Sequence, residues 1–188
     1  MEDLNLQEKT VNGVNIAVVQ DTINLASGQP EMAHSTFKIT NKWTGGTRST
    51  TTMGDMFAAK QTIAHKTELT IQSDEPEMLS GTDLAPNPVE QLLSALASCV
   101  TTSIIAHSAV RGITINALSS EIEGDIDLNG FLDLDSNVPI GYSEIRLKLL
   151  IDTDHEDIDE VASLHRFSPV YNTIINATPV KVEASQGA

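Results

Sequence analysis

The sequence has a single cysteine, Cys99, among its 188 residues. A lone cysteine cannot form a disulfide within the chain, which excludes a small fold held together by disulfide bridges. At this length a hydrophobic core can stabilise one domain without such bridges. Because chains without disulfides are typical of reducing compartments, we expect the protein in the cytoplasm.

Positive charge is also scarce. Lysine and arginine together number 11 against 26 aspartates and glutamates, which gives a formal net charge of −15 at pH 7. This charge argues against nucleic acid or an anionic membrane as a partner, because both would repel an acidic protein. The acidity names no partner by itself, and solubility explains it equally well.

Membrane and metal signals are missing as well. No apolar run suggests a membrane span, and the first residues, Met1 to Lys9, have no signal-peptide character. The histidines show no ligand spacing with one another or with Cys99, so we expect no metal site and no cofactor. The five histidines are His34, His65, His107, His155 and His165.

One stretch imitates a calcium-binding loop. Five residues fall at positions 1, 3, 5, 6 and 9 of the EF-hand pattern: Asp125, Asp127, Asn129, Gly130 and Asp133. Position 12 is Ser136, where the pattern needs glutamate, and the flanking residues alternate as strands rather than helices. Asn129-Gly130 between alternating runs predicts a hairpin turn instead, and we favour that interpretation.

What the sequence does contain is one long helical stretch. Asn87 is a suitable N-cap, Pro88 suits the first helical position, and Gly112 suits the C-terminal end. The predicted helix, Pro88 to Arg111, would be about 36 Å long and apolar on most sides, as buried helices are. Its most regular apolar stripe contains the only cysteine: Leu92, Leu96, Cys99, Ser103 and Ala106.

Before this helix the pattern predicts a short helix and several strands. Residues 12–27 have helical spacing and a stop at Gly28, although a strand through I-A-V-V is the alternative. Residues 34–43 and 48–53 predict a hairpin with its turn at Gly45-Gly46. Residues 64–73 predict another strand, and residues 74–86 predict a loop.

After the helix the pattern predicts strands, then helices, then one strand. Alternation from Ile113 predicts a strand that reaches the Asn-Gly pair, and residues 142–151 predict its partner. Asp154 is the predicted cap of a helix over 155–167, Ser168-Pro169 opens a short helix, and residues 180–182 form a last strand. This order predicts an α+β domain over 34–188, after an N-terminal extension over 1–33.

Two stretches resemble a known family. N-P-V-E-Q-L-L-S-A-L-A-S-C, ending at Cys99, resembles the N-P-x-E-x-L-L-x-A-L-x-x-C segment of OsmC-like proteins, which include organic hydroperoxide resistance proteins. S-P-V-Y-N-T-I, starting at Ser168, resembles the family segment C-P-V-x-x-x-L, and G-D-I-D-L-x-G-F-L fits one acidic subgroup. The resemblance covers residues 37–183. It implies an α+β fold with two antiparallel sheets around long central helices in an intertwined homodimer.

The resemblance also implies thiol peroxidase chemistry, in which a cysteine thiolate attacks an organic hydroperoxide. Cys99 stands at the peroxidatic position, but Ser168 stands where a second, resolving cysteine is expected. The family glutamate directly follows the proline, whereas here Glu90 comes one residue later. The family arginine has no clear counterpart, so Glu90, Arg48 and His65 are the candidates for substrate binding, with Lys66 a further cationic substitute.

Simpler explanations stay open for each site. Cys99 on an apolar helix face is also explained as a small buried hydrophobic residue, and Ser168 as a helix cap. His107, two turns after Cys99, is either a polar residue near a dimer core or a contact to a partner's cysteine. Two functions follow: a single-cysteine peroxidase that needs an external thiol reductant, or a non-catalytic dimer that binds a small apolar ligand.

The long apolar helix also predicts an obligate dimer. The other predicted helices of the chain are too short to surround it. A helix that is apolar on most sides needs packing partners on several faces. We therefore expect a large hydrophobic interface between two copies, of more than about 2,000 Å².

Overall fold

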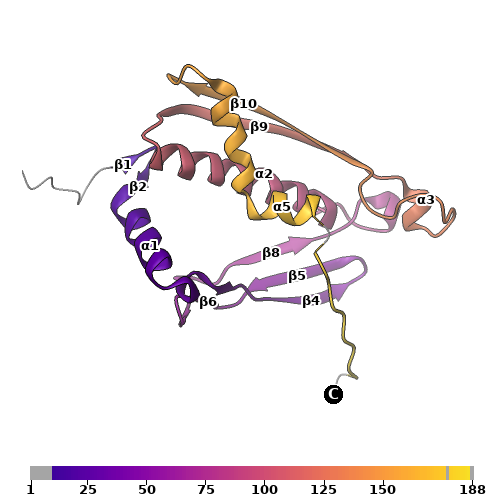
Figure 1. Ribbon diagram of the computed structural model, residues 1–188. Helices are drawn as coiled ribbons and strands as arrows, with labels where there is room; N and C mark the ends of the chain where they lie inside the picture. The colour runs from indigo at the N-terminus through magenta and orange to yellow at the C-terminus, as the bar shows by residue number, and fades with distance from the viewer. Residues whose placement is uncertain (1–9, 177, 187–188) are drawn as a thin grey trace, which may run out of the picture. The chain divides into compact units, whose positions relative to one another are not determined.

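The computed structural model describes residues 10–176 and 178–186, and it has an α+β architecture (Figure 1). The chain divides into two compact units, residues 1–94 and 95–188, which are described separately below. All strand pairs of the described residues are antiparallel. The α+β class is therefore confirmed, with strands grouped into four sheets rather than the two expected.

The first unit begins with a short hairpin and a helix. Strands β1 (Thr10–Val11) and β2 (Val14–Asn15) pair through a turn at Asn12 and Gly13, both of which have positive φ. Helix α1 (Ile16–Gly28) follows, and the Asn15 side chain accepts a hydrogen bond from the Val18 N–H at 3.3 Å. The helix is thus confirmed over the strand alternative, because Asn15 supplies a cap.

Three strands of this unit form a sheet in the order β4-β5-β8. Strands β4 (Ile39–Gly45) and β5 (Arg48–Met53) form the predicted hairpin, and β8 (Thr70–Ser73) pairs with β5. Gly45 and Gly46 both have positive φ, which explains why glycine occupies the turn. The Trp43 indole N–H donates to the Gly46 carbonyl at 2.8 Å and fixes the turn from one side.

A second small sheet was missed. Strands β3 (Ser35–Thr36), β6 (Met56–Ala58) and β7 (Gln61–Ile63) pair in the order β3-β6-β7, and a short 3-10 helix (η2, Pro30–Ala33) precedes them. The β6–β7 turn places Ala59 and Lys60 at positive φ, where sequence patterns expect glycine or asparagine. The predicted strands were also too long. Residues 37–38 interrupt the strand predicted over 34–43, and the strand predicted over 64–73 begins only at Thr70.

The loop before the long helix is organised around Asp74, which is buried. Its carboxylate accepts hydrogen bonds from the hydroxyl and N–H groups of Thr82, from the N–H groups of Glu75 and Leu84, and from the Thr47 hydroxyl. The loop contains one turn of 3-10 helix, η3 (Glu77–Leu79). These bonds hold a segment without regular structure in one conformation.

Helix α2 spans Pro88–Val110, which confirms the predicted helix to within one residue. The Gln91 side-chain amide donates to the Gln72 carbonyl at 2.9 Å and to the Ser73 hydroxyl at 2.8 Å. The first turn of α2 is therefore fixed to strand β8. The helix belongs to the first unit up to Ser94 and to the second unit from Ala95 onward.

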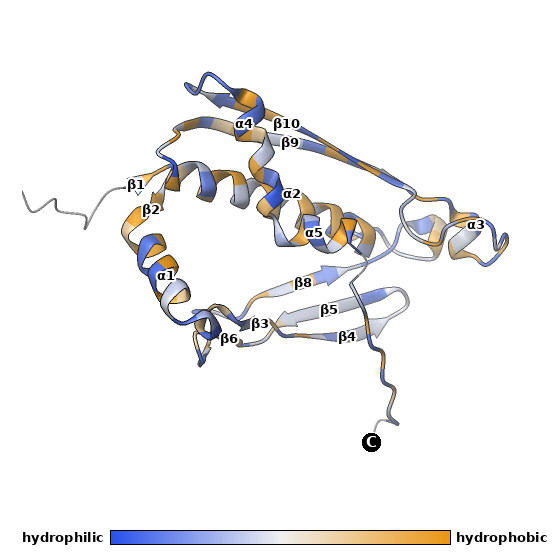
Figure 2. Ribbon diagram, viewed as in Figure 1, coloured by the Kyte–Doolittle hydropathy of each residue, from blue (hydrophilic) through white to orange (hydrophobic). Residues whose placement is uncertain are grey.

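The second unit contains two long strands, most of α2 and several shorter helical segments. Strands β9 (Ile115–Asp125) and β10 (Glu144–Thr153) pair along almost their whole length. The helical segments after β10 are α4 (Ile158–Ser163), the 3-10 helix η4 (Leu164–Phe167) and α5 (Pro169–Ile175). The core of this unit lies among α2, α4, η4 and the β9–β10 pair (Figure 2), and its fully buried side chains include Val100, Ile104, Val161 and Leu164.

The hairpin turn predicted at Asn129-Gly130 was wrong. Asn129-Gly130 lies inside a short helix, α3 (Leu128–Phe131), because the Asp127 carboxylate accepts from the Asn129 N–H and caps a helical turn. A Cβ on Gly130 would lie 2.5 Å from the Pro139 carbonyl oxygen, so glycine is needed here for close packing rather than for a hairpin.

Helix α4 begins later than predicted, because the cap is the carboxylate of Asp157, which accepts from the Glu160 N–H at 2.9 Å, and not Asp154. Residues 180–182 form no strand: they pair with no other strand of the described residues, and Val180 and Val182 are exposed. Alternating valines supply strand propensity, but a strand also needs a partner within reach.

The expectation that no segment reaches membrane-spanning length also needs correction. By length and composition alone, α2 would be able to cross a membrane. The same helix contributes the buried side chains of Leu96, Val100 and Ile104 to the core of the second unit. We therefore interpret α2 as a core helix.

Candidate functional site

Cys99 lies midway along α2 and is partly buried. Its backbone carbonyl accepts a hydrogen bond from the Ser103 hydroxyl at 2.8 Å. Because Cys99 comes eleven residues after Pro88, it lies far beyond the first turn, where the positive end of the helix dipole could stabilise a thiolate.

An apolar pocket of about 660 Å³ lies in the second unit, beside the same part of α2. Leu96 and Val100, one turn before and one residue after Cys99, form part of its wall. Strand β10 contributes Ile145, Leu147 and Leu149, and helix α5 contributes further apolar side chains. The volume lies within the range of about 300–1,000 Å³ that is typical of sites for small molecules.

A few polar side chains interrupt this apolar lining. His165 and Tyr171 both line the pocket, and their rings meet edge-on with centroids 4.9 Å apart. His165 Nδ1 lies 2.9 Å from the Ala162 carbonyl oxygen, and Asp159 contributes a carboxylate. No sequence motif marked these residues as a site, although an inward face for Tyr171 and Ile174 follows from the three-residue spacing within α5.

Ser168 caps helix α5, as the simpler explanation proposed. It is fully buried, and its hydroxyl oxygen accepts from the Tyr171 N–H at 3.1 Å. The Ser168 carbonyl accepts from the N–H and the side-chain amide of Asn172. Serine at this position therefore fixes the start of the helix that carries Tyr171 into the pocket.

The three candidates for substrate binding lie in the first unit. The Glu90 carboxylate accepts a hydrogen bond from the Asn87 N–H at 2.9 Å, which makes it part of the helix cap. Arg48 lines a smaller pocket of about 310 Å³, together with Asp74. His65 is exposed between β7 and β8. The structure therefore does not group Glu90, Arg48 and His65 with one another. Cys99 and Ser168 belong to the second unit.

Two aspartates of the stretch that resembles a calcium-binding loop, Asp125 and Asp127, form hydrogen bonds within the protein. Asp125 forms an ion pair with Arg146 at 2.6 Å, which lowers the pKa of the Asp125 carboxyl mainly through that side-chain hydrogen bond. Asp127 caps α3. In the part of the chain that the structure describes, no three His, Cys, Asp or Glu side chains are grouped as metal ligands.

Comparisons with known proteins agree with this architecture. A profile of the family described as OsmC-like protein matches residues 81–183, which include Cys99 and Ser168. No curated protein sequence matches the chain.

Several solved structures share the fold. An OsmC like protein from Mycoplasma pneumoniae is 21% identical and covers 76% of this chain and 89% of its own, with a TM-score of 0.57. A candidate osmotic stress induced and detoxification response protein from Psychrobacter arcticus is 18% identical over 72% of this chain and 85% of its own, with a TM-score of 0.54. An OsmC-like protein of unknown function from Vibrio cholerae is 10% identical over 74% of this chain and 94% of its own, with a TM-score of 0.54.

Proposed function

Since the chain belongs to the OsmC-like family, we propose that it is a thiol-dependent reductase of organic hydroperoxides that works with Cys99 alone. The observation that carries this proposal is the place of Cys99, partly exposed on α2 between two residues, Leu96 and Val100, whose side chains line an apolar pocket. Cys99 is not itself among the residues that line this pocket, but an apolar pocket at neighbouring positions of α2 suits the hydrocarbon part of an organic hydroperoxide.

The reaction needs no group beyond the thiol and an outside reductant. The Cys99 thiolate attacks the terminal oxygen of the hydroperoxide, the O–O bond breaks, and the alkoxide leaves as an alcohol after it takes a proton. Cys99 becomes a sulfenic acid. An external thiol then attacks the sulfenic sulfur and releases water, and a second external thiol reduces the mixed disulfide and restores Cys99.

The external reductant is required by the residues present. Ser168 stands at the position of the resolving cysteine, and serine cannot form a disulfide. Its hydroxyl is also fully buried and used as the cap of α5. Sulfenic acid on Cys99 therefore persists until an outside thiol arrives, and excess hydroperoxide drives it on to sulfinic acid.

Mass spectrometry tests this proposal directly. The reduced protein is treated with one equivalent of cumene hydroperoxide in the presence of dimedone, which traps sulfenic acids. We expect one dimedone adduct, on Cys99, and none in Cys99→Ser. An unmodified Cys99 in the wild-type protein would contradict the proposal.

The pocket supports a second candidate, a non-catalytic protein that binds a small apolar ligand. The pocket is large enough for a drug-sized molecule and is lined mainly by apolar side chains. An apolar fluorescent dye such as 1-anilinonaphthalene-8-sulfonate serves as the probe. Binding that is weakened by Leu147→Gln, together with a Cys99 that hydroperoxide leaves intact, would favour this candidate over the reductase.

We also propose that the protein is a dimer. The buried apolar side chains of the described residues all belong to the second unit, whereas the first unit exposes large apolar side chains on and beside its sheets. These exposed residues include Phe37, Ile39, Trp43, Leu69 and Ile71. Several large apolar side chains exposed in one unit are typical of a protein–protein interface. Sedimentation at micromolar concentration tests this, and a folded monomer there would contradict it.

A further inference from the structure

Two arginines of the second unit lie together without a carboxylate partner. Arg111 directly follows α2, and Arg166 is part of η4. Among the described residues, no carboxylate oxygen lies within 4.0 Å of either guanidinium. Most other lysines and arginines of the described residues also form no ion pair, so this absence alone does not distinguish Arg111 and Arg166. What distinguishes them is that both contact the same aromatic ring, Phe167.

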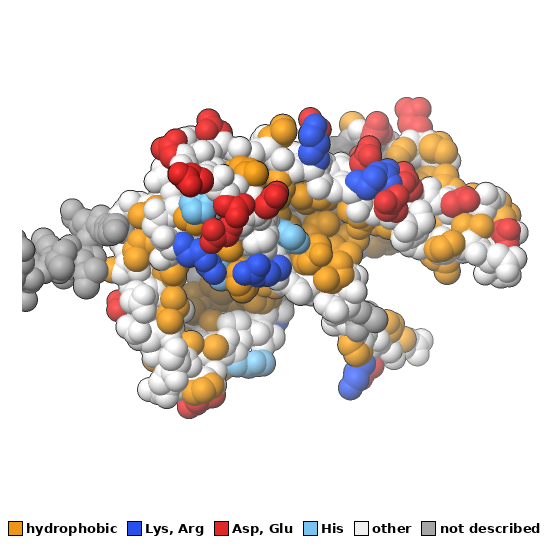
Figure 3. Space-filling view, turned by 45° about the horizontal axis from the view of Figure 1, so that its top comes forward, with side chains coloured by type: hydrophobic (Ala, Val, Ile, Leu, Met, Phe, Trp, Pro, Cys, Tyr) orange, Lys and Arg blue, Asp and Glu red, His pale blue; other side chains and the backbone are white. Residues whose placement is uncertain are grey.

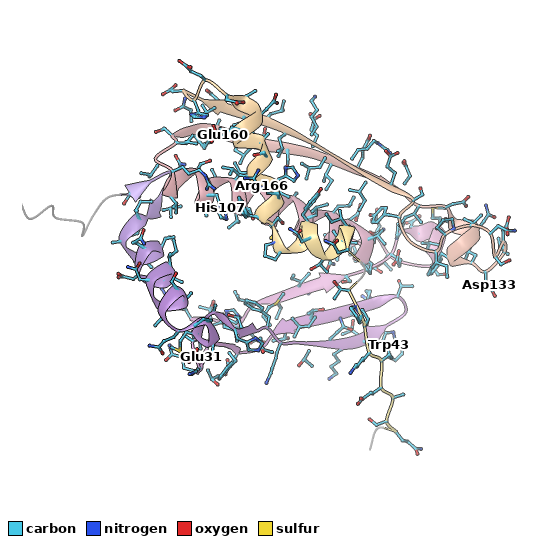
Figure 4. All side chains as sticks on the ribbon, viewed as in Figure 1. Glu31, Trp43, His107, Asp133, Glu160 and Arg166 are labelled. Atoms are coloured by element: carbon cyan, nitrogen blue, oxygen red, sulfur yellow. The ribbon has the colours of Figure 1, made fainter. Side chains whose placement is uncertain are left out.

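An aromatic pair holds the two arginines in place. The rings of His107 and Phe167 stack with centroids 4.0 Å apart and an interplanar angle of 18°. The guanidinium carbon of Arg166 lies 4.9 Å from the Phe167 ring centroid, and that of Arg111 lies 5.7 Å from it. Both distances are within the range of cation–π contacts. Figure 4 labels His107 and Arg166, which come from α2 and from the segment before α5.

The hydrogen bonds of these arginines leave donors for a ligand. Arg111 Nη1 donates to the His107 carbonyl at 2.8 Å, and Arg166 Nη1 donates to the Ser163 hydroxyl at 3.1 Å. Each guanidinium has five N–H donors in a planar fork, so these contacts orient each group and use only part of its donors. Both arginines and the Phe167 ring are solvent-exposed.

The positive charge beside the Phe167 ring comes from Arg111 and Arg166 and not from His107. Burial, followed by the positive charges of Arg111 and Arg166, lowers the pKa of His107 below its ordinary value. His107 is therefore neutral at pH 7 and adds no further repulsion to the two arginines. The nearby acidic side chain of Glu160 is directed to His155, at 3.1 Å. Figure 3 shows basic, acidic and histidine side chains next to one another on one face of the molecule.

We propose that Arg111 and Arg166 bind an oxyanion, the carboxylate or phosphate group of a small molecule, beside the Phe167 ring. A guanidinium pair binds such groups through short charge-assisted hydrogen bonds. Because the two guanidinium carbons lie 5.7 Å and 4.9 Å from the same ring centroid, an anion at this place is attracted by both positive charges. This site is separate from Cys99, because His107 lies about 12 Å further along α2 by helical rise.

A purely structural role accounts for only part of the arrangement. Arg111 lies at the C-terminal end of α2, where a cation stabilises the negative end of the helix dipole. Arg166 lies in the last turn of the short 3-10 helix η4, but the meeting of both guanidinium groups at the one Phe167 ring is not explained by either helix end. Two exposed guanidinium groups at one aromatic ring, with no carboxylate within 4.0 Å of either among the described residues, form the arrangement that an anion site requires.

A titration with inorganic phosphate and with acetate, followed by NMR, tests the proposal. Chloride keeps the ionic strength constant, and the signals observed are the His107 ring protons and the Phe167 ring protons. We expect saturable shifts with a dissociation constant in the millimolar range. The anion that binds more tightly identifies the group. Either Arg111→Gln or Arg166→Gln should weaken binding at least fivefold.

Lys148→Gln is the matched control, because it removes one exposed positive charge elsewhere in the same unit. It should leave the dissociation constant unchanged. Shifts that stay linear in anion concentration, or saturable shifts that survive in the Arg111→Gln/Arg166→Gln double variant, would overturn the proposal. Amide spectra of each variant show that it remains folded, and Arg166→Gln provides the test if Arg111→Gln disturbs the end of α2.

Discussion

Asn87 and Glu90 cap the long helix reciprocally. The Asn87 side chain accepts a hydrogen bond from the Glu90 N–H at 2.8 Å, and the Glu90 carboxylate accepts from the Asn87 N–H at 2.9 Å. This arrangement is a capping box, with asparagine in the place more often held by serine or threonine. A glutamate used in this way determines where α2 begins, and hence the position of every later residue of the helix, Cys99 included.

The capping box predicts separate effects for stability and for chemistry. Asn87→Ala should lower the free energy of unfolding by about 0.5–2 kcal/mol, since the first turn of α2 loses its cap. Glu90→Gln should be nearly neutral for stability, because glutamine can make the same hydrogen bond. Urea denaturation measures both. If Glu90 acts only in the cap, Glu90→Gln also leaves the rate of Cys99 oxidation unchanged, and a large loss of rate would show a direct role in the reaction.

Asp74 predicts a loss of stability at acidic pH. Its pKa is lowered in the folded protein, first by the hydrogen bond from the Thr82 hydroxyl and then by backbone N–H groups and the Thr47 hydroxyl. Because the folded pKa lies below the unfolded value of about 3.9, its stabilising contribution is complete above that value. The contribution is lost progressively as the pH falls through and below it.

Thermal unfolding between pH 7 and pH 3 tests this prediction. Asp74→Asn should lower the midpoint of unfolding at pH 7, because the amide N–H₂ cannot accept the hydrogen bonds that the loop donates. It should also flatten the decline toward pH 3. Asp55→Asn, which removes an exposed carboxylate of the same unit, is the matched control. An equal pH dependence in the wild type and in Asp74→Asn would contradict the role of Asp74.

Ser168→Cys should supply the missing resolving thiol. After one equivalent of hydroperoxide, we expect an intramolecular disulfide with Cys99, detected as a loss of both free thiols and of the dimedone adduct. Such a bond requires Cα atoms within about 7 Å. The variant should also be less stable, because the Ser168 hydroxyl caps α5. Retention of the adduct with no disulfide would show that the residue 168 side chain cannot reach Cys99.

Most of the fold was predictable where local signals and packing agree. Helix α2 has a proline at its first position and an apolar pattern throughout, and helix α5 has Ser168-Pro169 at its start. The β4–β5 hairpin has two glycines at a turn that needs positive φ. In these elements each local feature favours the same structure as the tertiary contacts.

The errors occurred where tertiary contacts override a local signal. Asn129-Gly130 is the strongest short hairpin signal, yet the cap from Asp127 and the close approach of Pro139 place it in a helix. The turn at Ala59-Lys60 has no sequence signature, so the β6–β7 hairpin could not be found. The cluster of Arg111, Arg166 and Phe167 joins two segments far apart in sequence, and no spacing rule brings them together.

The central claim is that the folded protein makes Cys99 reactive toward organic hydroperoxides. The most direct test compares the second-order rate of Cys99 oxidation by cumene hydroperoxide in the folded protein with the rate in the same chain unfolded in urea, at the same pH. A site built for this chemistry predicts a rate at least tenfold higher in the folded protein, and Cys99→Ser shows the background. An equal or lower rate in the folded protein would mean that the fold only shields the thiol, and it would contradict the proposed function.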